Sequence, residues 1–430
     1  MTSPYRKIAF AAGFSHMFCH GFMTIFPGVL IVLASEQSMG YFALGMAANI
    51  AYFLFGFGSI PAGLMVDRHG SHRMLVFSLL GMSVSAALIG LSPHIAVFAI
   101  AFGLMGFFAS VYHPAGLSLV TKHLAKPGKA LGLHGVLGNV GLAGAPLAAG
   151  IIVKLTGSWR MAYFAFAAAG FLFALVVWRM NLPGEERFSL ADTPALLGDM
   201  VLSFGGRRSA APVAGAAQTG ETGGAIPVSL VLLYVGCVFF GLVYRGSVTF
   251  FPALFASEVN AIAVSDNPAV YAGMLTSAVL FAGVIGQWAG GMFVEHLKRP
   301  EFGHIIIFAI AVPTLWFVGR TADTPLVVWA IAFNTVFYAW QPVQNGLVAK
   351  YTSRGARGLG YGLNFFLLMG VGSIATAIGG WIADEYGVYK IYQVLWYLAV
   401  ASLAVSLLVL RFSRLRVKVK VQYEMISEDA

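Results

Sequence analysis

Apolar runs of about 20 residues recur along almost the whole chain, each separated from the next by a few charged or turn-forming residues. A run of this length crosses the hydrocarbon core of a bilayer as an α-helix. The composition agrees, because 59% of the 430 residues are apolar and 10% are charged, whereas soluble proteins carry about 25% charged residues. The chain is therefore predicted to be an all-α membrane protein, since a β-barrel would need alternating segments of about ten residues.

The apolar runs predict twelve transmembrane helices in two sets of six. The first set covers residues 8–33, 41–66, 74–91, 95–120, 130–153 and 160–179. The second set covers residues 228–256, 269–294, 303–319, 325–348, 358–383 and 390–411. The residues between the sets are rich in Gly, Ala, Ser and Pro, which is typical of linkers. We expect an N-terminal six-helix bundle over 1–180, a flexible cytoplasmic linker over 181–226, a C-terminal six-helix bundle over 227–411 and a cytoplasmic basic tail over 412–430.

The basic residues are distributed unevenly over the two sides of the predicted bundle. Lys154, Arg160, Arg320 and Lys390 lie on one side and Arg245 lies inside a span, so the other 21 of the 26 share the side of both termini. Cytoplasmic loops retain Lys and Arg, which predicts a multi-pass protein of the inner (cytoplasmic) membrane with both termini cytoplasmic. The net charge of +9 is thus a topology signal, and we expect a lipid bilayer around the chain and no nucleic-acid partner.

The two sets of helices repeat each other in sequence. At an offset of 228 residues, His113 falls on Gln341, and Asp67 falls on Glu295. One constant offset that covers several helices indicates two parallel six-helix repeats. That architecture is typical of a transporter in which two bundles rock around a binding site near the bilayer midplane.

The polar residues inside the spans predict the charge of the substrate. None of the 17 acidic residues lies deep in a span, whereas Arg245 does. A lone Arg at that depth costs at least about 2.5 to 3.5 kcal/mol on insertion scales, so it should face a cavity or a partner. At an offset of 225 residues it falls opposite His20, which predicts a cationic cavity for a small anion such as a phosphonate or organic phosphate. The alternative is that Arg245 bonds backbone carbonyls near the outer rim and only anchors its helix.

Further polar residues extend the candidate site. His113, Gln341, Asn139 and Asn364 are the other substrate-binding candidates. Histidine is the side chain inside the spans that titrates near neutral pH, so His20 and His113 are predicted to couple transport to protons. The alternative is that each packs and hydrogen-bonds between helices.

A charged loop over residues 63–73 separates the second and third predicted spans. Gly63 permits a close helix approach, Asp67 can pair with a base, and Gly70 permits a tight turn. The loop resembles the signature of the major facilitator superfamily, although two residues after the last glycine are not the bases of that pattern. The resemblance implies a gate that locks the outward-facing state through charge contacts between the bundles. The gate residues so implied are Gly63, Asp67, Arg68, Gly70, Arg73 and, in the second repeat, Glu295.

The fifth predicted span carries small residues at regular spacing. Gly132, Gly141 and Gly150 form a flat face, and Pro146 removes one backbone hydrogen bond, so the helix can bend and pack closely. The pattern resembles the motif of the antiporter branches of the superfamily, with Ala in place of Gly at two positions. This resemblance implies export rather than uptake, while the alternative is plain tight packing.

Three further segments resemble one branch of the superfamily. They are residues 108–114, Ser15-His16 with His20, and residues 138–141. Together they are similar to the fosmidomycin-resistance-type drug:proton antiporters.

Several other classes lack their sequence signals in this chain. There is no glycine-rich phosphate loop after a strand, no Cys or His cluster with metal spacing, and no room for an ATPase domain. We therefore expect no cofactor, no metal and no enzymatic activity. The sequence favours a monomeric secondary transporter that exports a small, anionic molecule or drug in exchange for protons. The alternatives are uptake of a metabolite or inorganic anion, a sensor or scaffold without transport, and an integral membrane enzyme.

Overall fold

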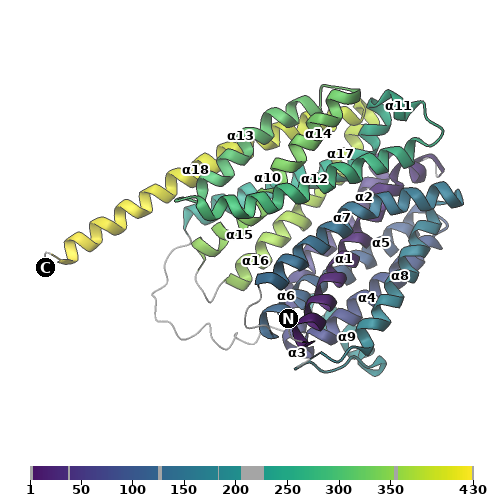
Figure 1. Ribbon diagram of the computed structural model, residues 1–430, viewed down its shortest axis with the longest axis horizontal. Helices are drawn as coiled ribbons and strands as arrows, with labels where there is room; N and C mark the ends of the chain where they lie inside the picture. Colours follow the sequence, from purple (N-terminus) through teal and green to yellow (C-terminus); the bar gives the residue numbers. More distant parts are fainter. Residues whose placement is uncertain are drawn as a thin grey trace.

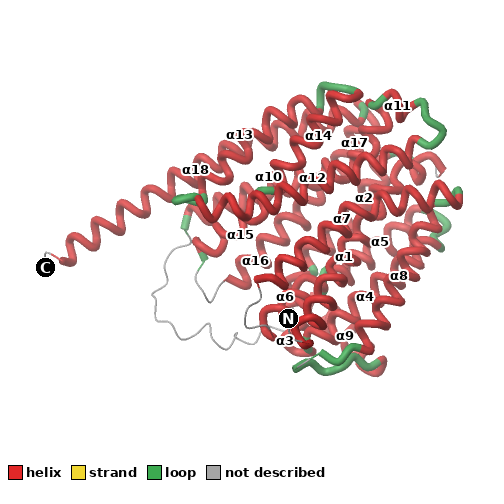
Figure 2. The backbone as a smooth tube through the Cα atoms, viewed as in Figure 1, coloured by secondary structure: helices red, strands yellow, loops and turns green. Residues whose placement is uncertain are grey.

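The computed structural model describes residues 3–36, 39–123, 128–182, 184–204, 227–352 and 357–428. Within these residues the regular elements are helices joined by short loops (Figure 2). Figure 1 shows the first half of the chain and the second half as two groups of helices that lie side by side. The predicted all-helical fold is confirmed.

The first half of the chain forms six spans. Four of them are the single helices α1 (Ser3–Glu36), α4 (Ser71–Gly90), α7 (Gly128–Thr156) and α8 (Trp159–Arg179). The other two are broken, as α2 (Tyr41–Phe57) with α3 (Ser59–His69), and α5 (Ile95–Ala109) with α6 (Tyr112–His123). The axis bends by 45° between α2 and α3.

The second half repeats this order. Its spans are α10 (Val228–Glu258), α12 (Pro268–His296), α13 (Glu301–Val318), α14 (Asp323–Tyr338) with α15 (Trp340–Tyr351), α16 (Arg357–Phe365) with α17 (Ile374–Tyr386), and α18 (Val388–Glu428). The short helix α11 (Asn260–Ala263) follows α10. Among the described residues, eleven helices are long and apolar enough to cross a membrane, and the bent α2–α3 pair makes up to twelve. Each predicted span overlaps one of these helices or helix pairs.

One helix crossing shows the repeat at the level of side chains. In the first half, a side chain at Gly106 of α5 would collide with the Ala51 carbonyl of α2, so the two helices cross at van der Waals distance. At the offset of 228 residues, Asn334 of α14 donates a 2.7 Å hydrogen bond to the Val279 carbonyl of α12. At the same crossing, the two helices pack closely on a glycine in the first half and are joined by a hydrogen bond from a buried amide in the second half.

The segment after α8 contains helical structure inside the range expected to be a flexible linker. A 3-10 turn (Leu190–Asp192) leads into α9 (Thr193–Phe204). Ser189 and Asp192 form a capping box at this start, and Leu196 and Met200 are buried. The Gly- and Ser-rich composition that indicated a linker comes mainly from residues 205–226, which lie outside the described residues. At the other end of the chain, α18 continues through most of the expected basic tail.

The two sides of the molecule are distinguished by the ends of the helices. On the side of the N-terminus, α3, α6 and α15 end and α7 and α16 begin (Figure 1). We call this the terminus side. On the opposite side, called the far side, α2 and α12 begin and α7 and α17 end. The two bundles meet where α2 packs along α17 and α7 packs along α12.

Candidate functional site

Arg245 of α10 lies buried between the two bundles, with 3% of its surface exposed. Its guanidinium carbon lies 4.0 Å from the centre of the Tyr52 ring of α2, in the other bundle. Tyr52 is held in place because its hydroxyl donates a 2.9 Å hydrogen bond to the Met23 carbonyl. The cation–π contact therefore joins the two halves of the molecule.

The hydrogen-bonding capacity of Arg245 is largely unused in the described residues. Nη2 donates to the Met369 sulfur at 2.8 Å, which is a weak acceptor. Nε is buried and lacks a partner among the described residues. A guanidinium has five N–H donors in a planar fork that matches carboxylates and phosphates. Among the described residues, this geometry leaves strong donors free for an anion at the bundle interface, and no backbone carbonyl of the kind considered from sequence accepts from Arg245.

Three histidines lie together beside this interface. Ring nitrogens of His16 and His20 of α1 and His113 of α6 all lie within 4.8 Å of one another. His16 Nδ1 donates to the His134 carbonyl at 2.7 Å, so its Nε2 carries a lone pair. Nε2 of His16 and Nε2 of His113 are buried without partners among the described residues. We call His16, His20 and His113 the histidine cluster.

The histidine cluster faces the second bundle. The His113 ring lies 4.6 Å from the ring of Phe365, which belongs to α16, and Phe365 also makes an edge contact with Phe55 at 5.3 Å. His20 lies 6.4 Å from the Phe55 ring of α2, one helical turn from the Tyr52 ring that contacts Arg245. The residues predicted for substrate and proton binding on α1, α6 and α10 are thus brought to one region between the bundles.

The predicted amide residues divide into two groups. Asn139 of α7 donates to Gln287 of α12, and Gln287 donates to Gln341 of α15 at 2.6 Å. This chain of amides crosses from one bundle to the other on the terminus side of Arg245. Asn364 lies apart from it and accepts a 2.7 Å hydrogen bond from the buried Gln344. Gln287 was not among the candidate site residues predicted from sequence. Its amide lies between those of Asn139 and Gln341 and completes the chain of hydrogen bonds.

The loop over residues 63–73 contacts its own bundle and the segment after it. Gly70 has φ 81 and forms the turn, as predicted. Asp67 forms an ion pair with Lys122 at 2.9 Å, and Arg68 forms one with Asp199 of α9 at 2.8 Å. A side chain at Gly63 would meet nothing within 4 Å, so the close helix approach expected there is absent. The ion pairs described for these charges lie within the first bundle and the segment after it, while α3 itself packs against α16 of the second bundle.

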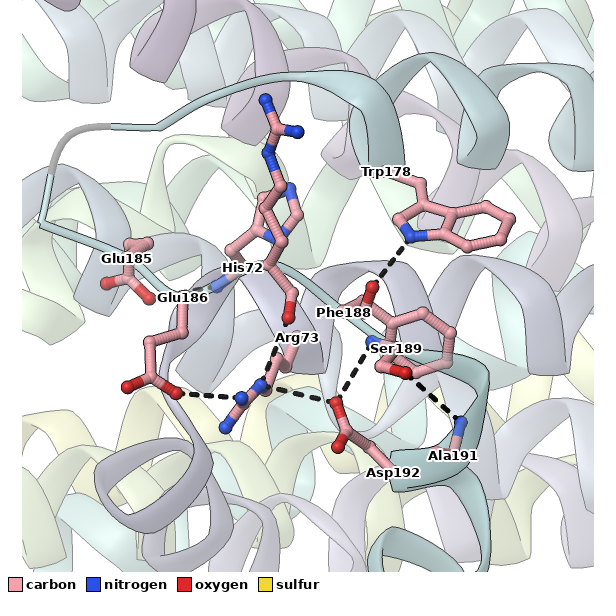
Figure 3. A network of polar contacts seen from close by, with 10 residues as sticks. His72, Arg73, Trp178, Glu185, Glu186, Phe188, Ser189, Ala191 and Asp192 are labelled. Carbon is pink, nitrogen blue, oxygen red and sulfur yellow. Dashed lines mark hydrogen bonds and ion pairs between the residues drawn. The ribbon is translucent and has the colours of Figure 1, made fainter.

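Arg73 fastens the segment that follows α8 to this loop (Figure 3). It pairs with Glu186 at 2.7 Å and with Asp192 at 3.3 Å, and its Nε donates to the Arg187 carbonyl at 3.2 Å. Glu185 accepts from His123 of α6 at 2.8 Å. We call residues 184–204 the strap, because these bonds hold them across the terminus side of the first bundle.

Replacing Arg73 with alanine is expected to loosen the strap. Three contacts are lost, and exposed ion pairs contribute about 0.2 to 1 kcal/mol each. A loss of about 1 kcal/mol would make tryptic cleavage after Arg187 about fivefold faster in limited proteolysis. Lys122→Ala is the matched control, because it removes an ion pair outside the strap. Equal cleavage rates in the two variants would contradict this role of Arg73.

The second repeat has its own carboxylate–lysine pair on the terminus side. Glu295 lies in α12, but its side chain is outside the described residues. Lys350 is the repeat equivalent of Lys122 at the offset of 228 residues, and it forms an ion pair with Glu301 at 2.6 Å. Glu301 was missed from sequence because it lies six residues beyond the position that aligns with Asp67, and the Lys122–Lys350 correspondence is the signal that could have found it.

The small residues of the fifth span face two neighbours. Gly132, Gly141, Pro146 and Gly150 all lie in α7. A side chain at Gly141 would collide with the Met17 carbonyl of α1, and one at Gly150 would lie 3.5 Å from Val270 of α12. The face therefore packs α7 against its own bundle and against the other bundle, where small residues let helices come close.

Asp384 of α17 joins the bundles at the far side. One of its carboxylate oxygens accepts from the Tyr41 backbone N–H at 2.7 Å and the other from the Phe42 N–H at 2.8 Å. These N–H groups belong to the first turn of α2, which has no intrahelical acceptor for them. We call this contact the far-side latch.

Replacing Asp384 with alanine is expected to open the far side. Loss of a capping carboxylate costs about 1 to 2 kcal/mol, which raises the population of the open arrangement about 5- to 30-fold. Spin labels at the exposed positions Leu155 and Val264 would report a longer distance by pulsed electron resonance.

Asp323→Ala is the control for the latch. Asp323 accepts from the Asn260 backbone at 2.7 Å and from its side chain at 2.9 Å, entirely within the second bundle. The label distance should not change in this control. An unchanged distance in Asp384→Ala would mean that the latch does not hold the far side closed.

Comparison with known proteins agrees with this architecture. The sequence profile of the Major Facilitator Superfamily matches residues 10–376. The chain is similar to a solved bacterial homolog of the human lysosomal transporter Spinster, with a TM-score of 0.76, 16% identity, and coverage of 96% of this chain and 98% of that one. It is also similar to the nucleoside transporter NupG, with a TM-score of 0.69, 11% identity, and coverage of 95% and 100%. These structures share the fold.

Three curated proteins show local sequence similarity. The drug efflux pump JefA of Mycobacterium tuberculosis is 28% identical over 154 residues, covering 35% of this chain and 28% of JefA. The probable nitrate transporter NarT of Staphylococcus haemolyticus is 30% identical over 129 residues, covering 30% and 32%. A probable hexose phosphate transport protein of Chlamydia pneumoniae is 24% identical over 160 residues, covering 37% and 35%. The similarity thus spans about a third of each relative.

Proposed function

The chain belongs to the Major Facilitator Superfamily, and on that premise we propose that it exports a small anionic molecule in exchange for protons. The observation that carries the proposal is Arg245, which is buried between the bundles with unfilled donors and contacts Tyr52, one turn of α2 from the Phe55 ring that neighbours His20. A buried cation attracts a ligand of opposite charge because the low dielectric strengthens their interaction. In this proposal Arg245, His20, Asn139 and Gln341 contact the substrate.

His20 and His113 are the proposed proton carriers. They lie beside the proposed substrate position. A proton on either ring would attract an anionic substrate and repel the Arg245 guanidinium. Loading of a proton and loading of the anion are thereby linked. The proposal places the terminus side in the cytoplasm and the protein, as a monomer, in the inner membrane. It also assigns the chain to the drug:proton antiporter branch, in accord with the efflux activity named for JefA.

The electrical driving force suits export of an anion. Exchange of one outgoing monoanion for one incoming proton moves two elementary charges in the same electrical direction. Each charge is worth about 2.3 kcal/mol for every 100 mV across the membrane. A membrane potential that is negative inside therefore drives this exchange more strongly than it drives cation–proton exchange, in which the charges cancel.

Accumulation in whole cells tests the direction of transport. Cells that express the protein should accumulate less of a radiolabelled phosphonate than cells that express the Arg245→Gln variant at equal level. A protonophore should abolish the difference, because it removes the driving force. Higher accumulation in cells with the unaltered protein would contradict export.

Uptake of an inorganic anion or a phosphorylated metabolite is the second candidate. The names of two relatives favour it, since one is a probable nitrate transporter and another a probable hexose phosphate transport protein. Uptake would use the same cationic site but would move anion and proton in the same direction. The whole-cell experiment separates the two candidates by the sign of the effect.

A further inference from the structure

The histidine cluster has a geometry that transport of an anion does not require. Three imidazoles from two helices converge with their ring nitrogens within 4.8 Å of one another. We propose that His16, His20 and His113 bind a divalent transition-metal ion of the Zn²⁺ type in the first bundle. Sequence spacing predicted no metal site, because His113 lies far along the chain from the other two.

The first support for the site is the state of the nitrogen atoms. A histidine ligates a metal through a nitrogen that carries no proton. Because His16 Nδ1 donates to the His134 carbonyl, the proton of the neutral ring is on Nδ1 and Nε2 is free to ligate. Nε2 of His16 and of His113 are buried and lack partners in the described part of the chain, which is costly unless a ligand satisfies them.

The second support is the set of residues that hold His16. Its ring stacks on His134 at 4.0 Å and on Tyr112 at 5.1 Å. His134 Nε2–H donates to the Tyr112 hydroxyl oxygen at 2.7 Å, since that hydroxyl itself donates to the Ala12 carbonyl. This bond holds the two rings beside His16. A side chain at Gly138 would collide with the imidazole of His16, so the glycine provides its space. Outer residues that orient a metal-binding histidine in this way are typical of metal sites.

The ligand set selects the kind of ion. Imidazole nitrogen suits Zn²⁺, Cu²⁺, Co²⁺ and Ni²⁺, whereas Mg²⁺ and Ca²⁺ require oxygen ligands. Zinc–nitrogen bonds of about 2.0 to 2.1 Å place tetrahedral ligands about 3.4 Å apart, so the rings must close by about 1.5 Å at most. His20 and His113 are half-buried, so this adjustment falls on the two less buried rings. Three histidines leave one coordination position open, and the charge of nearby Arg245 favours an anion there.

Equilibrium binding of Co²⁺ to the purified, tag-free protein tests the site. Co²⁺ takes the place of Zn²⁺ in tetrahedral sites and absorbs visible light there. We expect one Co²⁺ per chain with an intense visible spectrum, displaced by Zn²⁺ and not by Mg²⁺ or Ca²⁺. His16→Gln and Gly138→Ala should each weaken binding at least about tenfold. His304→Gln is the matched control, because His304 is a buried histidine of the second bundle and its loss should leave binding unchanged.

The same measurement can overturn the proposal. Absence of a stoichiometric Co²⁺ spectrum in the unaltered protein would contradict it, as would equal affinity in His16→Gln. A variant that elutes as a single species in gel filtration and keeps its melting temperature without metal has folded, so its loss of binding is informative. Zn²⁺ should also raise the melting temperature of the unaltered protein and of His304→Gln but not of His16→Gln. Since no transport is measured, the result is independent of the proposed function.

Discussion

Substitution of Arg245 by glutamine is expected to raise the KM for an anionic substrate by about 10- to 100-fold. Hydrogen bonds to a charged group contribute about 1.5 to 3 kcal/mol, and every 1.4 kcal/mol is a factor of ten in affinity. Glutamine keeps a shorter polar side chain but removes the charge and the planar fork. The KM is measured from initial rates of substrate flux in proteoliposomes.

Two further variants make the Arg245 result specific. Arg245→Lys keeps the charge and loses the fork, so its KM should lie between that of the unaltered protein and that of Arg245→Gln. Arg320→Gln is the matched control, because Arg320 is also stacked on an aromatic ring, at 3.2 Å from the centre of Trp316, but is exposed at the far side. Its KM should equal that of the unaltered protein. An unchanged KM in Arg245→Gln would leave Arg245 a structural residue.

Replacing both His20 and His113 with glutamine is expected to abolish proton exchange while downhill substrate flux continues. The two rings lie 5.4 Å apart beside the substrate position, so one can take over the proton when the other is lost. Single variants should therefore retain part of the coupling. The measurement is the ratio of proton flux to substrate flux in proteoliposomes that contain a pH-sensitive dye.

The control for the double variant is again His304→Gln, whose side chain stacks on Trp340 at 5.6 Å within the second bundle. Its ratio of fluxes should be unchanged. A metal chelator in every sample keeps a bound ion from altering the protonation of the rings. Normal coupling in the double variant would refute the assignment of His20 and His113.

The helices could be predicted from sequence because the bilayer imposes their length and apolar character on each span separately. The broken spans illustrate the limit of that reasoning. The bend at Gly58 lies within one apolar run, and nothing in the hydropathy of residues 41–66 indicates it. Pro61 has no backbone N–H to donate to the Phe57 carbonyl, which weakens the helix at this point, and Gly58 packs against Ser110 of the neighbouring span, which is a tertiary contact.

The candidate site was partly accessible to sequence reasoning. Arg245 and His20 could be found because a charge at membrane depth is costly and because the two repeats align. His16 could not be assigned a role, since its significance depends on the positions of His134 and Gly138 on another helix. Glu301 escaped notice for a similar reason, because its pairing with Lys350 is made between spans.

The most direct test of anion export coupled to protons is the voltage dependence of the exchange. Proteoliposomes are loaded with a monoanionic phosphonate, and a potassium diffusion potential is imposed with valinomycin while internal pH is recorded. The account predicts that protons enter as the anion leaves and that a potential negative inside accelerates both. Protons that move in the same direction as the anion, at a rate independent of the potential, would contradict it.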